Sequence, residues 1–223
     1  MSASERVQQA WANRVKAEYH SAAITAELLH WLIQTGISPD TIESCHRIVL
    51  EEFNHATMSR QVYLATGGSE EQIQIPFQHL TYQKEKQYPT PLRALSMCAR
   101  VFCCGETVAV PLFKALLEHS KSDVSTPVLE QILADEAGHK FFGWELLDEL
   151  LEMLGEDSKY WLKERIESYI EEVRNAYNSN DEICSLQDQQ WGLMAGIQYK
   201  QITEQCIADI IQPRFRERGL LDS

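Results

Sequence analysis

The sequence predicts an all-α fold: a four-helix bundle of two antiparallel hairpins joined by one long crossover, with two additional C-terminal helices. Three observations predict this fold. Gly and Pro are scarce and clustered, and the stretches between the clusters carry apolar residues at helical period. No stretch shows the alternating pattern that would compete as a strand. The lengths of the connections indicate which helices pair.

Local signals bound each expected helix. Ser or Pro precedes most starts, and Gly or Pro follows most ends. The expected helices run from about Ser4 to Thr35 before Gly36, from Ser38-Pro39-Asp40 to Thr66 before Gly67, from Pro91 to Ser120, from Ser125 to Gly155, from Ser158 to Asn178, and from Ile183 to Gln212, where Pro213 ends the last one.

The connections predict the topology. A few residues join the first helix to the second and the third to the fourth, so each pair forms a hairpin. The segment from Gly67 to Thr90 is long enough to run the length of the bundle. Two hairpins with one long crossover are the ferritin-like topology. We expect a single domain over 1–223, with a four-helix core at about 4–155 and covering helices at about 158–212.

Composition limits the classes of function. The 223 residues carry a net charge of −13, with 33 acids against 20 bases. Such a surface repels nucleic-acid phosphates and anionic membranes. No apolar run approaches the ~18–20 residues that span a bilayer, and the N-terminus shows no apolar core of a signal peptide. A cytoplasmic location is therefore expected. The six cysteines form no Cys-x-x-Cys pair.

One carboxylate interrupts the apolar stripe of each of the first four helices. The third helix shows this best, with the stripe Leu95, Ala99, Phe102, Glu106, Ala109, Phe113, Leu116. In the second and fourth helices a histidine follows the glutamate by three residues, which places both side chains on one face. The candidate metal ligands are Glu18, Glu52, His55, Glu106, Glu136 and His139.

Helix phase separates these motifs from similar ones. The chain contains four Glu-x-x-His motifs. Glu43 precedes Glu52 by nine residues, about half a turn out of phase, so Glu43 faces solvent. In the first helix the choice between Glu18 and Glu27 stays open. The hairpin geometry slightly favours Glu18, which shares a stripe with Val15 and Ala22.

Four buried glutamates would repel one another unless cations neutralise them. Four carboxylates carry −4, and two divalent ions carry +4. Carboxylates mixed with imidazoles suit iron or manganese better than zinc. We therefore expect two Fe ions, with Mn or a mixed Mn/Fe pair as alternatives. Glu51 and Asp135, directly before the two motifs, are expected to accept the outer N–H of a ligand histidine, each from the opposite hairpin.

These residues resemble a family. Glu18, the Glu52–His55 motif, Glu106 and the Asp135–His139 segment resemble the ligand set of the ferritin-like di-iron carboxylate superfamily. The segments from Glu18 to Ala23 and from Asp135 to Trp144 are similar to small bacterial ferritin-like domain proteins, which favours Glu18. The resemblance covers about residues 10–155. Ferritins proper have one histidine at this site, whereas two here indicate an enzyme that activates O2. Ile132 occupies the position of an additional histidine in arylamine N-oxygenases.

The resemblance implies a di-iron oxidoreductase that uses O2 to oxidise a small organic substrate, with a separate protein as electron donor. Two alternatives stay open: an iron-handling ferroxidase or peroxide-protection protein, and a metal-free helical interaction protein. The oligomeric state is open too, a homodimer included.

Several residues around the candidate site have two interpretations. Phe102 and Cys103 are candidates for lining a cavity beside the metals. Gly143 either makes room in that cavity or allows close helix packing. Aromatic residues of the covering helices either contact substrate or fill the core: Trp161, Tyr169, Tyr177, Trp191 and Tyr199.

Overall fold

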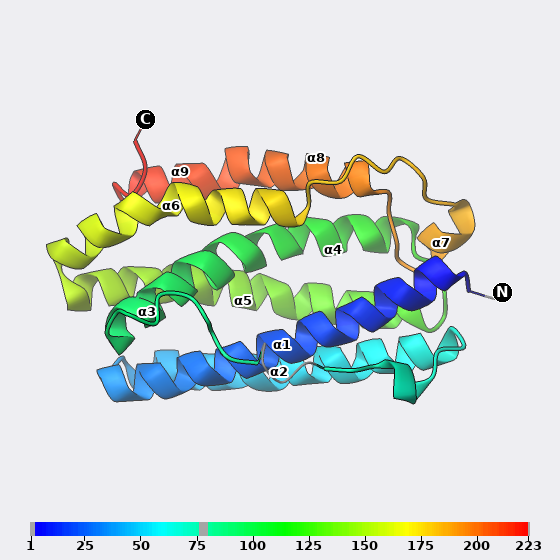
Figure 1. The fold of residues 1–223 in the computed structure, drawn as a ribbon, viewed down its shortest axis with the longest axis horizontal. Coiled ribbons are helices and arrows are strands. Elements are labelled where there is room, and N and C mark those ends of the chain that lie inside the picture. The colour runs from blue at the N-terminus through cyan, green and yellow to red at the C-terminus, as the bar shows by residue number, and fades with distance from the viewer. Residues whose placement is uncertain (1–2, 76–79, 223) are drawn as a thin grey trace.

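The computed structural model describes residues 3–75 and 80–222, and this part of the chain is helical with no β-strand (Figure 1). The predicted all-α class is confirmed. Four residues of the expected crossover, 76–79, lie outside the described part. The longer helices are α1 (Glu5–Thr35), α2 (Pro39–Ala65), α3 (Thr90–Met97), α4 (Thr107–His119), α5 (Ser125–Leu154), α6 (Glu156–Ala176) and α8 (Gly196–Cys206).

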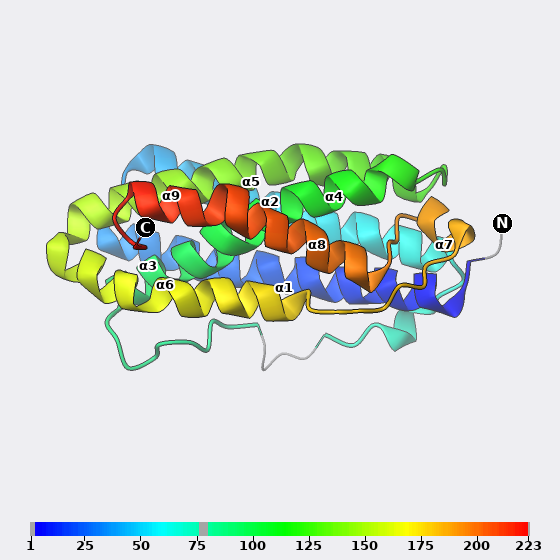
Figure 2. The same ribbon diagram turned by 90° about the horizontal axis from the view of Figure 1, so that it is seen from above.

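The helices stack in three layers (Figure 1). α1 packs against α2 in one layer. The rod formed by α3, the π-helix η3 (Cys98–Glu106) and α4 packs against α5, which also contacts α2. α6 lies on η3, and α8 lies on α4. Figure 2 shows the described parts of the connection from α2 to α3 running along the side of this bundle. The layers place α1, α2, η3 and α5 around a common interior.

Local capping sets the ends of the first hairpin. The Ser4 side chain accepts a hydrogen bond from the Val7 N–H at the start of α1. Gly36 ends α1 at φ 77°, a left-handed conformation that favours glycine. The Ser38 side chain accepts from the Thr41 N–H at the start of α2. Both helices therefore begin and end within a residue or so of the predicted positions.

Glu27 holds the crossover against α1. Its Oε2 accepts a hydrogen bond of 2.6 Å from the Tyr82 N–H, and its Oε1 lies 3.7 Å from Arg93 Nη2. Tyr82 in turn hydrogen-bonds Ser96 of α3 at 2.8 Å. The Glu27 carboxylate therefore serves the crossover and does not face the interior shared by the four helices.

The expected third helix is not a regular α-helix throughout. Residues Cys98–Glu106 form a π-helix between α3 and α4. A π-turn contains more residues than an α-turn, so it rotates everything that follows relative to the predicted stripe. Val108 and Leu112 are buried after Glu106, whereas Ala109 and Phe113 are only half-buried. The predicted buried stripe is thus wrong at Ala109 and Phe113.

The expected sixth helix is broken. The chain forms a short α7 (Leu186–Gln190), a turn through Gly192 at φ 79°, and then α8. A second π-helix, Ile207–Ile211, links α8 to α9 (Gln212–Glu217), so Pro213 does not end the helical segment. In a regular helix the Pro213 ring would clash with the carbonyl four residues before it. Here the residues before Pro213 form a π-helix instead, and the helical segment continues past the proline.

Gly143 of α5 allows η3 to approach closely. A Cβ at Gly143 would lie 2.5 Å from the Cβ of Phe102. The Gly143 carbonyl accepts from the thiols of Cys98 at 3.2 Å and Cys103 at 3.3 Å. The packing interpretation of Gly143 therefore holds. Phe102 and Cys103 are fully buried in this contact, and neither lines the cavity that opens onto Glu18 and Glu106, contrary to the expectation.

We expect Gly143→Ala to lower the free energy of unfolding by about 1–3 kcal/mol, because the new methyl group overpacks the contact with Phe102. Gly138→Ala is the matched control in the same helix, since a Cβ there meets nothing within 4 Å. The control should raise stability by about 0.5–1 kcal/mol. Denaturant unfolding of both variants tests this, and equal shifts would contradict the close contact.

Candidate metal centre

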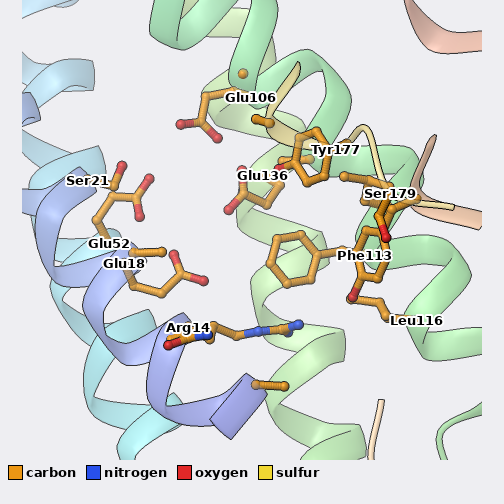
Figure 3. A pocket seen from close by; sticks show the side chains of 18 residues that line it. Arg14, Glu18, Ser21, Glu52, Glu106, Phe113, Leu116, Glu136, Tyr177 and Ser179 are labelled. Carbon is orange, nitrogen blue, oxygen red and sulfur yellow. The ribbon is translucent and has the colours of Figure 1, made fainter. Parts of the chain in front are cut away.

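The six predicted ligands converge from four helical segments. Glu18 comes from α1, Glu52 and His55 come from α2, and Glu106 ends η3. α5 supplies the remaining two. All six are nearly inaccessible to solvent, with exposed fractions between 0% and 9%. Figure 3 shows the carboxylates of the four glutamates directed toward one space. The six residues are Glu18, Glu52, His55, Glu106, Glu136 and His139.

Each histidine is held from its outer side by an acid of the other hairpin. His55 Nε2 lies 3.0 Å from Asp135 Oδ2, and His139 Nε2 lies 3.0 Å from Glu51 Oε2. The carboxylates accept these hydrogen bonds, so each ring carries a proton on Nε2. This arrangement leaves Nδ1 of each ring facing the glutamates, which is the orientation a metal ligand needs.

The inner nitrogens lie among carboxylate oxygens. His55 Nδ1 is 3.9 Å from Glu18, 3.8 Å from Glu52 and 3.9 Å from Glu136. His139 Nδ1 is 3.3 Å from Glu52 and 3.5 Å from Glu136. Two ligands bound at about 2.1 Å to one ion lie about 3–4.2 Å apart. Glu52 and Glu136 each reach both histidines and are therefore placed to be shared.

The donor atoms fit a metal for a second reason. Among the six candidate ligands, four buried atoms have no hydrogen-bond partner: Nδ1 of both histidines and Oε2 of Glu52 and Glu136. A buried polar atom left unpaired costs about 1–3 kcal/mol, and an ion bound by such a cluster would remove that cost. Two overlapping groups have atoms close enough to hold one: Glu52 with Glu106, Glu136 and His139, and Glu18 with His55 and Glu136.

The pKa shifts of these side chains also indicate a site suited to cations. Burial raises the pKa of Glu18 and Glu106 well above the usual range, and the neighbouring carboxylates raise it further. Burial also raises the pKa of Glu52, but the attraction of the histidines outweighs it and lowers this pKa to about 2. Burial lowers the pKa of His55 and His139, yet the carboxylates raise them to about 9 and about 12. A metal ion that bound to this cluster would therefore displace protons from it.

The structure places Glu18, not Glu27, among the candidate ligands. Glu18 is 7% exposed and faces His55, whereas Glu27 is bound to the crossover. Glu43 and His46 are exposed on the outside of α2. The role of the six residues as metal ligands stays a prediction, and so does the supporting role of Glu51 and Asp135.

A cavity of about 670 Å³ opens onto the carboxylates. Its walls include Glu18, Glu52, Glu106 and Glu136 on one side, and apolar side chains of α4 on the other (Figure 3). Sequence reasoning missed Arg14, which also lines this cavity. The signal was present, because a residue four positions before Glu18 lies on the same side of α1, one turn away.

Two of the five aromatic candidates line this cavity. Tyr177 and Tyr199 do so, with stacked rings 6.1 Å apart. Tyr169 donates a hydrogen bond to Glu85 at 2.8 Å, and Trp191 accepts one from the Trp11 ring through its carbonyl. The fifth candidate, Trp161, packs edge-on against Tyr88. The last three therefore pack elsewhere in the structure.

Comparison with family models, curated proteins and solved structures finds no match for this chain. In the described residues, no helix is both long enough and apolar enough to cross a membrane.

We expect Asp135→Asn to weaken metal binding about 10–100-fold, because the amide holds the His55 ring less firmly and donates less charge to it. The control is Glu145→Gln, an acid of the same helix that borders the same surface cavity as Asp135. Metal affinity measured by competition with a chelator separates the two. Equal affinities would show that the hydrogen bond to His55 does not support the metal.

Proposed function

We propose that this chain is a non-haem di-iron oxidase or oxygenase built on a ferritin-like bundle. Each iron would be held by one histidine and one glutamate of its own, with Glu52 and Glu136 in reach of both histidines. The observation that carries the proposal is the pair of Glu-x-x-His motifs whose inner nitrogens and carboxylates remain unpaired beside a cavity. Glu18 and His55 would hold one ion, Glu106 and His139 would hold the other, and Glu52 and Glu136 would serve both.

The chain's own residues have separate tasks. Asp135 and Glu51 orient the two imidazoles. The four glutamates neutralise the charge of the ions. When bound, a pair of ferrous ions supplies the electrons and Lewis acidity with which O2 is reduced and an organic substrate is oxidised. A separate protein is expected to return the electrons.

The donor set favours iron. Carboxylate oxygens and imidazole nitrogens are typical of iron and manganese centres. Neither group of candidate ligands includes a cysteine, and Cys98 and Cys103 are engaged with Gly143. Manganese or a mixed pair remains the competing occupant.

The cavity favours oxidation of an organic molecule over iron storage. Its volume of about 670 Å³ lies in the range of small-molecule sites. Phe113, Leu112 and Leu116 give it an apolar wall, and Tyr177 and Tyr199 add aromatic surface. A path that only passes iron has no need of such walls.

Anaerobic titration of the metal-free protein with Fe(II), followed by admission of O2, tests the proposal. We expect two irons per chain, an absorption change on exposure to O2, and O2 consumption that accelerates with substrate. Glu52→Gln should lose iron, whereas Glu43→Gln, in the exposed Glu-x-x-His motif, should keep two. Accumulation of many irons per chain would instead favour iron handling. No tight iron, followed by no tight manganese, would overturn the metal centre.

A further inference from the structure

Arg14 brings a positive charge into the cavity beside the candidate metal centre. It lies on α1 one turn before Glu18 and lines the same cavity as the four glutamates. In Figure 3 its side chain extends along the cavity toward Phe113 and Leu116, away from the carboxylate cluster. A ligand in this cavity can therefore contact Arg14 at one end and the metal centre at the other.

The guanidinium is held by aromatic rings and forms no ion pair in the described residues, although Glu18, one turn along α1, lies close enough to be influenced by its charge. Its central carbon lies 4.6 Å from the centre of the Trp11 ring and 4.9 Å from that of Phe113. Nη1 is buried without a hydrogen-bond partner. Among the described residues no carboxylate lies within 4.0 Å of it, although the chain has 33 acids. Other arginines differ: Arg93 pairs with Glu27, and Arg218 pairs with Asp148.

This charge is in excess once the metal centre is filled. Two divalent ions balance the four glutamates, so Arg14 leaves the cavity with one uncompensated positive charge. Arg14 is half-buried, with Nη1 itself buried and unpaired, and a ligand with one negative charge satisfies that group. The flat guanidinium fork also matches a carboxylate, which it binds through two parallel hydrogen bonds.

We propose that the cavity binds a small organic monocarboxylate, with its carboxylate on Arg14 and its apolar part along Phe113, Leu112 and Leu116. The inference rests on the proposed function, because it names the class of substrate that the metal centre oxidises. A phosphate dianion fits less well, since the cavity lining offers only one cationic side chain. The end of the ligand opposite its carboxylate lies nearest the glutamates.

The test is equilibrium binding, measured by calorimetry on protein loaded with Mn(II) so that no turnover occurs. The probes are octanoate and 3-phenylpropanoate, each beside its uncharged amide of the same shape. We expect each acid to bind at least about 10-fold more tightly than its amide. Arg14→Gln should weaken binding of the acids about 10–100-fold and leave the amides unchanged. Arg14→Lys, which keeps the charge and loses the fork, should fall between.

Lys16→Gln removes a positive charge from the same helix at a residue outside the cavity lining, and it should bind both acids like the unaltered protein. Metal stoichiometry and melting temperature are measured for every variant. If two ions bind but acids and amides bind alike, or if Arg14→Gln binds acids normally, the inference fails while the metal centre stands.

If no metal binds, the proposed function fails, and the same titrations on the metal-free protein decide the inference alone. Binding of the acids that depends on Arg14 would support it, and its absence would overturn it. The comparison of acid with amide on the unaltered protein decides the matter even if the Arg14 variants do not fold.

Discussion

Loading the metal-free protein with two divalent ions is expected to raise its melting temperature by about 15–30 °C. Each ion present at about 1,000 times its Kd contributes about 4 kcal/mol, so two contribute about 8 kcal/mol. For a chain of this size each kcal/mol shifts the melting temperature by about 2–4 °C. The physical source is the cluster of buried carboxylates and unpaired nitrogens, which the ions satisfy.

Calorimetry of chelator-treated protein with and without excess Mn(II) measures this shift. The shift should grow from pH 6 to pH 8, because the ions displace protons from groups whose pKa is raised, His55 and His139 among them. A double variant, His55→Gln with His139→Gln, serves as the control and should respond little. Identical melting temperatures with and without metal would contradict a buried metal centre.

Glu106→Gln is expected to reduce the bound metal from two ions to one and to stabilise the metal-free protein by about 1–3 kcal/mol. The first effect follows because Glu106 belongs to only one of the two ligand groups, with His139, Glu52 and Glu136. The second follows because the amide removes a buried carboxyl group whose neighbours are also carboxylates. Metal analysis after gel filtration and denaturant unfolding measure the two effects.

Glu27→Gln is the matched control, for which we expect the opposite effect on the stability of the metal-free protein and no loss of metal. Glu27 pairs with Arg93 and caps Tyr82, so its substitution should lower the stability of the metal-free protein slightly and keep both ions. A Glu106→Gln protein that retains two ions at unchanged affinity would remove Glu106 from the ligand set. A Glu27→Gln protein that loses an ion would reopen the choice between Glu27 and Glu18.

Helix ends and helix faces could be predicted wherever short-range chemistry decides them. Ser4, Gly36 and Ser38 act through hydrogen bonds and backbone angles within a few residues, so their effect is legible in the sequence. The spacing of Glu52 from His55, or of Glu136 from His139, likewise places both side chains on one face of any α-helix. The position of Glu18 could be predicted only in part, because the geometry of the first hairpin places a ligand between Glu18 and Glu27.

The π-helix at Cys98–Glu106 could not be predicted in this way. π-turns are rare and occur mostly as single turns inside α-helices, so apolar periodicity does not predict them. Here the π-helix accompanies the contact of Phe102 with Gly143, which are distant in sequence. The break at Gly192 also involves a distant residue, because a side chain there would meet Leu129.

By itself, the sequence determined the all-α class, the ends of most helices and the set of acids and histidines that share helix faces. Only the tertiary structure decided that Glu18 and not Glu27 faces the histidines, which side chains line the cavity, and that Arg14 lines it without an ion pair. The reason is physical: periodicity and capping act along one helix. By contrast, the bonds from His55 to Asp135 and from His139 to Glu51 exist only when α2 and α5 lie side by side.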